Sequence, residues 1–443
     1  MTWGIAFRAR QYLRGSLWVI PLLGALAGPL LAELDMIVEQ HITLPTSWQY
    51  SESTAATVLS AVVASMIGLT GIVVTIGILV VQLATGTLSA RYMRLWYRDA
   101  LQKAVLASFL GTFTFAYALL RRVGPTSVPS LGVTMTGLAI AISLVLFLLY
   151  LDRFIHRLRP VAVAAFVARA GRDVLVAVRE RRRPDQGSTA GPLARDGRAV
   201  VVLTPRAGVL QAIDLKGLVR LGRRRDVTVR LHYTVGDYVP EGAALLSVFG
   251  GDGAATTGRR AQGMFAFGRE RTIEQDPAFA LRIIVDIAIR ALSPAVNDPT
   301  TAVQLLDHVE ALLQLAGEDE VDERLELYDE RGVVRLASPV RGWAAYFALG
   351  VTEIREYGAS SMQVSRRLQA MYQHLLGTVR SEHRAVVEAE MARLDADLRA
   401  LRPDPERRAY AATPDRQGIG GVAPDRPPDV THPLGSSGSG DAS

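Results

Sequence analysis

The chain has 443 residues, 49% of them apolar, and is long enough for two or three domains. Cysteine is absent, which excludes disulfides, thiolate catalysis and Cys-ligated metal sites. The net charge of +6 comes almost entirely from arginine, a bias typical of GC-rich genomes. No basic stripe interleaved with aromatic residues and no helix-turn-helix or RNA-binding signature accompanies it, so we expect no nucleic-acid partner.

Four long apolar runs occupy the first third of the chain, near 17–37, 54–83, 100–120 and 131–151. Each has about 20 residues or more, which is enough to cross a hydrocarbon core of roughly 30 Å. The first run resembles a signal peptide, because arginines precede it and small residues lie near Ala32. Its length and the three runs after it favour an uncleaved span. Residues 1–160 are therefore predicted to form a four-span domain in a lipid bilayer.

The positions of the basic residues predict how these spans are oriented. Residues 33–52, between the first two runs, contain no Lys or Arg, whereas basic residues flank the other ends of the spans. Cytoplasmic loops are enriched in Lys and Arg, so both termini are predicted to be cytoplasmic, as in a multi-pass bacterial inner-membrane protein. Only Arg121 and Arg122 oppose this orientation. The supporting residues are Arg8, Arg10, Arg14, Arg91, Arg94, Arg98, Lys103, Arg153, Arg157 and Arg159.

The second run carries small and hydroxyl residues at helical spacing, which gathers them on one face while Val, Ile and Leu fill the others. This stripe can pack against another helix of the same protomer, because small residues let helix backbones approach closely. Alternatively, it lines a water-filled path in an oligomer, with Gln82 as the only amide deep in a span. No charged residue is expected within the spans, which argues against a proton-coupled pump. The stripe comprises Thr57, Ser60, Ala61, Ala64, Gly68, Gly71, Thr75, Gln82, Thr85 and Ser89.

The remainder of the chain is predicted to form a cytoplasmic α+β domain in four segments. Residues 161–197 form a membrane-proximal helix and linker, and residues 198–250 alternate in polarity and form a small β-rich module. The helical domain is assigned to residues 251–402, and its first part, at 250–263, is expected to be a flexible linker. From residue 403 to 443 Pro, Gly, Ser and Asp dominate, which indicates a disordered tail.

One turn in the β-rich segment, "GDYVPEGAALLSV", looks like the turn of biotinyl/lipoyl-like barrel-sandwich domains. The Met-Lys attachment turn of those domains is missing, and Lys216 in "DLKG" lacks the expected neighbours. We therefore expect no carried cofactor and no metal.

The most unusual segment is "ALSPAVNDPTTA", residues 291–302. The residue before a proline avoids helical geometry, so Ser293 ends one helix. Asp298 starts the next as N-cap, followed by a first-turn proline. These features predict a capped corner. A polar ligand site is the competing interpretation, and it suits a cation or a neutral ligand better than an anion. The candidate residues are Arg290, Ser293, Asn297, Asp298, Thr300 and Thr301.

The helix that precedes this corner is apolar on most faces and is therefore expected to be buried. Its exceptions, Arg282, Asp286 and Arg290, are spaced by four and form one ladder. This ladder is predicted to be paired internally or to face a site.

Together, four N-terminal spans, "VVQLATGTLSARYMRLWYRD", the β segment and "QDPAFALRIIVDIAIRALSPAVNDPTTA" resemble the bacterial predicted membrane proteins of domain-of-unknown-function family 2254. The resemblance covers about residues 10–400. The chain departs from the expected motif at Gly86-Thr87 and Ser89-Ala90. The resemblance implies this architecture and a membrane location, and it implies no activity.

Two functions remain open from the sequence. The first is an oligomeric, channel-like or transport protein with a cytoplasmic regulatory domain, for which a homo-oligomer is expected. The second is a membrane-anchored sensor or scaffold that binds a ligand or partner. An enzyme is not expected, because the seven His residues form no metal-spaced cluster and no nucleophile elbow is present.

Overall fold

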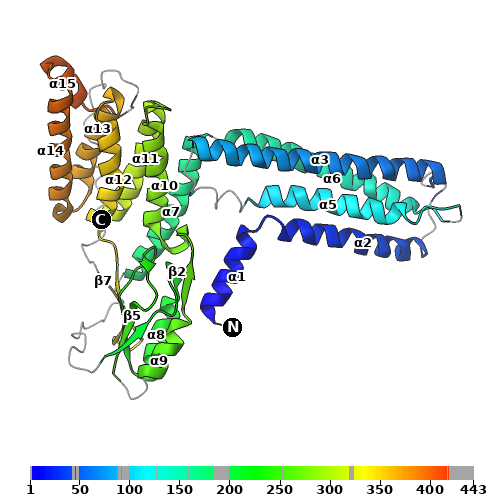
Figure 1. The fold of residues 1–443 in the computed structure, drawn as a ribbon, viewed down its shortest axis with the longest axis horizontal. Helices are drawn as coiled ribbons and strands as arrows, with labels where there is room; N and C mark the ends of the chain where they lie inside the picture. Colours follow the sequence, from blue (N-terminus) through cyan, green and yellow to red (C-terminus); the bar gives the residue numbers. More distant parts are fainter. Residues whose placement is uncertain are drawn as a thin grey trace, which may run out of the picture.

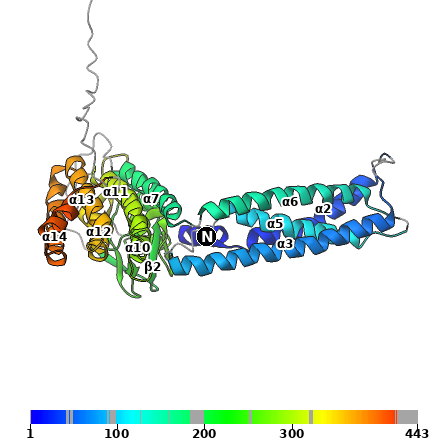
Figure 2. The ribbon, with the colours of Figure 1, turned by 90° about the horizontal axis from the view of Figure 1, so that it is seen from above.

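The protein has two parts, an elongated helical bundle and a C-terminal domain attached to one end of it (Figures 1 and 2). The computed structural model describes residues 2–41, 45, 49–87, 91, 99–125, 127–157, 159–182, 199–250, 254–318, 324–416 and 418. We refer to residues 160–418 as the C-terminal domain.

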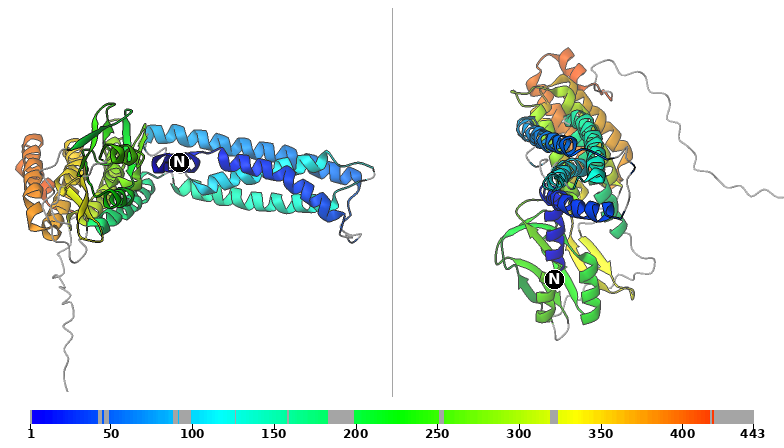
Figure 3. Two further views of the ribbon diagram at one scale, coloured as in Figure 1. Left: turned by 90° about the horizontal axis from the view of Figure 1, so that it is seen from below. Right: turned by 90° about the vertical axis from the view of Figure 1, so that its right-hand side faces the viewer.

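Four helices of the bundle are long and apolar enough to cross a membrane. They coincide with the four apolar runs. The longest, α3, has 36 residues and so extends over about 54 Å. In the view along the bundle, α5 packs against the other three (right-hand view of Figure 3). The four helices are α2 (Val19–Glu39), α3 (Glu52–Thr87), α5 (Ala100–Leu120) and α6 (Ser130–Arg157).

The closest helix contact in the bundle joins α2 and α5 through glycines. A Cβ atom on Gly24 would lie 2.4 Å from the carbonyl oxygen of Ala107, and one on Gly28 would lie 2.6 Å from that of Gly111. Each helix thus contributes a pair of small residues four positions apart. Lipid tails are as apolar as leucine, so burial of apolar surface does not drive helices together in a membrane. Close packing of the helix backbones is therefore one of the main interactions that stabilise their association.

The prediction that no charged residue lies within the spans is wrong for α2. This helix continues to Glu39 and so includes Glu33, Asp35 and Glu39, which the sequence pattern placed in a loop. Asp35 is buried against α6, and Glu39 accepts hydrogen bonds from the backbone N–H groups of Ser130 (2.8 Å) and Leu131 (3.3 Å). The carboxylates are stable there because the first turn of α6 presents unpaired N–H groups and a positive dipole.

An N-terminal helix that the hydropathy pattern did not reveal, α1 (Trp3–Gly15), precedes α2 and docks on the C-terminal domain. The N–H of Gly4 donates to the carbonyl oxygen of Gly263 at 3.0 Å, and a Cβ on Gly4 would clash with the backbone of Phe265. The N-terminus and the C-terminal domain therefore lie at the same end of the bundle (Figure 1).

Two small sheets form the β part of the C-terminal domain, in the orders β1-β5-β3-β8-β7 and β4-β2-β6. Neighbouring strands are antiparallel except for β3 and β8, which are parallel. The strands are β1 (Val200–Leu203), β2 (Gly208–Ile213), β3 (Thr228–Leu231), β4 (Tyr238–Val239), β5 (Ala244–Phe249), β6 (Phe265–Gly268), β7 (Arg324–Tyr328) and β8 (Val334–Pro339). Two helices accompany them, α8 (Leu215–Arg225) and α9 (Ala254–Gln262).

The predicted boundary at residue 250 is wrong in three ways. The helix α9 occupies most of the expected linker, and β6 follows it. The hairpin of β7 and β8 interrupts the segment 251–402 that was predicted to be helical, and it completes the five-stranded sheet. These strands have only four to six residues, too few for a clear alternation, and distant partners in the chain stabilise them.

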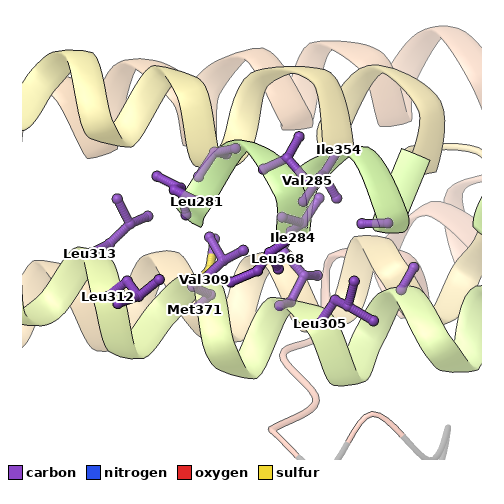
Figure 4. Packing of buried hydrophobic residues seen from close by; sticks show 14 of the residues in the cluster. Leu281, Ile284, Val285, Leu305, Val309, Leu312, Leu313, Ile354, Leu368 and Met371 are labelled. Carbon is purple, nitrogen blue, oxygen red and sulfur yellow. The ribbon is translucent and has the colours of Figure 1, made fainter. Parts of the chain in front are cut away.

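The helical layer of the C-terminal domain is built around α10, which contacts α7, α11 and α12. Figure 4 shows Leu281, Ile284 and Val285 of α10 among apolar side chains from the neighbouring helices. The layer consists of α7 (Pro160–Arg182), α10 (Pro277–Ala291), α11 (Pro299–Gly317), α12 (Trp343–Gly358), α13 (Met362–Thr378), α14 (Arg384–Leu401) and α15 (Pro405–Ala412), with short 3-10 turns at η3 (Ile273–Gln275) and η4 (Ser381–His383).

Two further segments differ from the prediction. The helix α7 is more than a membrane-proximal connector, because Val163, Ala164 and Val167 are part of the domain core. The segment after residue 402 is not disordered throughout: α15 packs on α13 and α14. Fully buried Arg366 donates to the hydroxyl of Tyr410 at 2.8 Å and lies over its ring. The pattern missed α15 because a two-turn helix has too few residues to show a period. Residues 419–443 of the predicted tail lie outside the described part of the chain.

We expect Gly28→Ala to destabilise the bundle by about 1–3 kcal/mol, because the added methyl overlaps Thr114 and the backbone of Gly111. Thermal unfolding of the purified protein in detergent measures the change. Gly137→Ala on α6 is the matched control, since no atom lies within 4 Å of its added Cβ. Equal melting temperatures for the two variants would contradict the close contact of α2 with α5.

Candidate functional site

The small and hydroxyl residues of α3 point away from the helix bundle. Apolar residues, most of them large, make the opposite, buried face, which packs towards α5: Ala55, Leu59, Val62, Met66, Val73 and Val80. At 100° per residue the stripe lies about half a turn away from these residues. Its described members are all exposed in the single chain: Thr57, Ser60, Ala61, Ala64, Gly68, Gly71, Thr75 and Gln82. The backbone of Thr85 lies in the last turn of α3, while its side chain and Ser89 lie outside the described residues.

The structure therefore does not show this stripe packed against another helix of the same protomer. Nothing lies within 4 Å of a Cβ built on Gly68 or Gly71, in contrast to Gly24 and Gly28 of α2. The sequence pattern identified a helix face correctly but could not say which helix pair uses small residues for close contact. Among the residues that the structure describes, α2 and α5 make such a contact through Gly24, Gly28 and Gly111.

The prediction that Gln82 is the only amide within the spans needs correction. Gln82 lies near the C-terminal end of α3, next to Val81, which packs against the core of the C-terminal domain. A second amide, Gln102, is buried near the start of α5. Gln82 thus lies near the end of α3 that meets the C-terminal domain.

At that end of α3 an ion-pair network joins the bundle to α10. Asp286 accepts hydrogen bonds from Arg91, four residues beyond α3, and from Nε of Arg282 (2.6 Å). The guanidinium of Arg282 also forms two hydrogen bonds with the carboxylate of Glu353 on α12, one of them at 2.8 Å. We call these four residues the α3–α10 junction.

The charges of the junction stabilise one another. The hydrogen bond from Arg282 lowers the pKa of Glu353, and the same bond raises the pKa of Arg282. Glu353 is therefore ionised throughout the physiological pH range. The side chain of Asp286 is only 13% exposed, so losing a partner there would leave a poorly hydrated charge.

The predicted ladder thus divides into two parts. Arg282 and Asp286 are paired internally and across to the bundle, whereas Arg290 is exposed at the far end of α10. The sequence could not identify these partners, because Arg91 lies 195 residues from Asp286 and Glu353 lies 71 residues from Arg282.

Residues 291–302 form a sharp corner between α10 and α11. The side chain of Asp298 accepts hydrogen bonds from the N–H (3.0 Å) and the hydroxyl (2.5 Å) of Thr301, and Pro299 is the first residue of α11. Asn297 has a φ of 48°, the left-handed conformation that asparagine tolerates well. Ser293 donates its hydroxyl to the carbonyl oxygen of Arg290 at 2.7 Å.

Each unusual side chain of this corner therefore has a structural partner or a conformational reason. Thr300 and Asn297 are exposed, while Thr301 is buried. Among the residues that the structure describes, no three His, Asp or Glu side chains come together in a way that could hold a metal ion.

Four apolar helices long enough to span a membrane, joined to a domain of helices and small sheets, define a helical membrane protein. Residues 14–374 match the family described as predicted membrane protein (DUF2254), and the chain belongs to this family. An uncharacterized protein of Mycobacterium bovis and another of Mycobacterium tuberculosis are each 28% identical to the chain over 396 residues, covering 86% of this chain and 76% of the relative. No solved structure matches the chain.

The N-cap at the corner gives a direct test. Asp298→Ala is expected to lose about 1 kcal/mol of stability, and Asp298→Asn should restore most of it, because asparagine caps helices about as well as aspartate. Chemical denaturation of the purified protein measures both. A stable Asp298→Asn variant that has lost the ion flux that we propose below would instead identify the corner as a ligand site.

The α3–α10 junction can be tested by a double-mutant cycle. Arg91→Gln and Asp286→Asn should each destabilise the protein, and their coupling energy should be about 0.5–1 kcal/mol, since Arg91 is half exposed. Arg91→Gln combined with Asp307→Asn is the control and should be additive, because Asp307 pairs with Arg367 on α13. Additivity in both pairs would rule out the contact between α3 and α10.

Proposed function

We propose that this protein acts as a homo-oligomer in the bacterial inner membrane, in which the stripe of α3 faces other copies and lines a path for ions or small polar solutes. The observation that carries this proposal is the position of the stripe on the exposed side of α3, opposite the face that packs in the bundle. Contact with lipid alone does not require a row of small residues on a helix face. The same row lets a second helix backbone approach closely.

The hydroxyl groups near the stripe are consistent with a helix that meets either protein or water. Thr57 donates to the carbonyl oxygen of Ser53, and Ser65 donates to that of Ala61. These bonds keep the hydroxyls satisfied within α3. In an assembly the same groups can turn towards solvent molecules, because exchanging a backbone acceptor for water costs little.

The C-terminal domain is suited to control such a path. Helix α3 ends against it, and the α3–α10 junction ties this end to the most buried helix of the domain. A movement of α10 would therefore be transmitted to the end of α3 that carries Gln82. The proposal includes no catalytic role and puts both termini in the cytoplasm, which is the orientation that the distribution of basic residues favours.

The competing proposal is a membrane-anchored sensor or scaffold that binds a ligand or partner through its cytoplasmic domain. It predicts a protein whose stripe faces lipid and which conducts nothing. The mass of the purified protein in detergent and the flux in reconstituted vesicles separate the two.

We expect an oligomeric mass, and a flux of monovalent ions that Gln82→Leu changes by at least a few-fold, because it replaces the one amide of the stripe with an apolar side chain. Ile78→Leu, one turn earlier in α3, is the control and should leave the flux unchanged. A monomeric protein whose vesicles show no flux would end the channel proposal in favour of the scaffold.

A further inference from the structure

A cavity of about 470 Å³ lies where α1, the start of α8, the end of β2 and β7 meet. Small-molecule pockets typically measure about 300–1,000 Å³. Its walls combine apolar and aromatic side chains with a few polar groups. The lining residues are Trp3, Ile213, Asp214, Leu215, Lys216, Val219, Arg220, Gln275, Leu327 and Tyr328.

Most of the polar groups in this lining already have protein partners. The carboxylate of Asp214 caps α8 by accepting from the N–H of Gly217 at 2.9 Å. The amide of Gln275 bonds both the N–H (3.0 Å) and the carbonyl oxygen (3.3 Å) of Ile213. The hydroxyl of Tyr328 donates to Glu326 at 3.1 Å. These groups hold the walls of the cavity in place.

Two positively charged side chains of the lining lack such protein partners within the described part of the chain. Lys216 and Arg220 lie one turn apart on α8 and are exposed, and neither forms an ion pair or hydrogen bond with another residue in the described part of the chain. Like charges at this spacing repel each other. Lysine is also rare in this chain, which has only Lys103 besides Lys216. An anion between the two side chains would relieve the repulsion and gain two charge-assisted hydrogen bonds.

We propose that this cavity binds an organic phosphate, with the phosphate held by Lys216 and Arg220 and an aromatic or apolar group lying among Trp3, Val219 and Leu327. Nucleotides and the headgroups of anionic phospholipids share this chemistry. Because Trp3 belongs to α1, which precedes α2, the bound molecule contacts both the helix that leads into the bundle and the β sheets. The site goes beyond the proposed path along α3, and its occupancy is measured without any flux.

Binding is tested on the full-length protein in detergent with two probes, the fluorescent nucleotide MANT-ADP and the short-chain lipid dihexanoyl phosphatidylglycerol. We expect saturable binding of at least one probe, weakened tenfold or more by Lys216→Gln with Arg220→Gln. Arg224→Gln with Arg225→Gln is the matched control, because it removes the same charge from exposed residues of the same helix that do not line the cavity.

The two probes distinguish the source of the phosphate, and binding of either one that depends on Lys216 and Arg220 supports the site. Trp3→Ala should weaken the binding of MANT-ADP about tenfold and Trp3→Phe should retain it, because an aromatic face at this position is what stacks on the base. Absence of binding by both probes, or an equal loss in the two double variants, would overturn the proposal. Thermal unfolding of each variant establishes that it is folded.

Discussion

The structure depends most on the burial of α10. Apolar side chains cover this helix on every side except one, and it packs against α7, α11 and α12 at once. A helix in such an environment can carry charge only where a partner neutralises it, because an unpaired buried charge costs several kcal/mol. Arg282 and Asp286 lie on the one charged face of α10. On this face Arg282 pairs with Glu353, and Asp286 pairs with Arg91. In this way the packing of the C-terminal domain also determines where the bundle attaches.

The bundle follows a different constraint. Burial of apolar surface cannot hold helices together in lipid, so close packing and satisfied polar groups must do so. The α2–α5 contact meets this requirement with glycines. A small hydroxyl cluster meets it at the contact of α5 with α6, where Ser108 and Ser143 lie 2.7 Å apart. With these contacts made inside the chain, the small residues of α3 are left on the outside. That separation is the physical basis for proposing that α3 faces another copy of the protein.

The connections between the two parts are more numerous than a single linker would provide. Helix α1 docks on β6, the end of α3 meets α10, and α6 leads directly into α7, which is part of the domain core. Changes in the C-terminal domain can therefore reach three helices of the bundle. The cavity beside Trp3 lies at the first of these connections, and the α3–α10 junction lies at the second.

The sequence by itself determined the features that depend on local chemistry. Four runs of sufficient length predicted the candidate spans, and the order Ser-Pro followed by Asn-Asp-Pro predicted the corner at 291–302, because proline geometry and side-chain capping act within a few residues. Only the tertiary structure decided which face of α3 is buried, that β6, β7 and β8 are strands, and that Arg91 meets Asp286. Each of these depends on partners far along the chain, and a period in the sequence identifies a face without identifying what covers it. The same holds for the cavity, since Trp3 and Lys216 are 213 residues apart in the chain and only the docking of α1 brings them to one site.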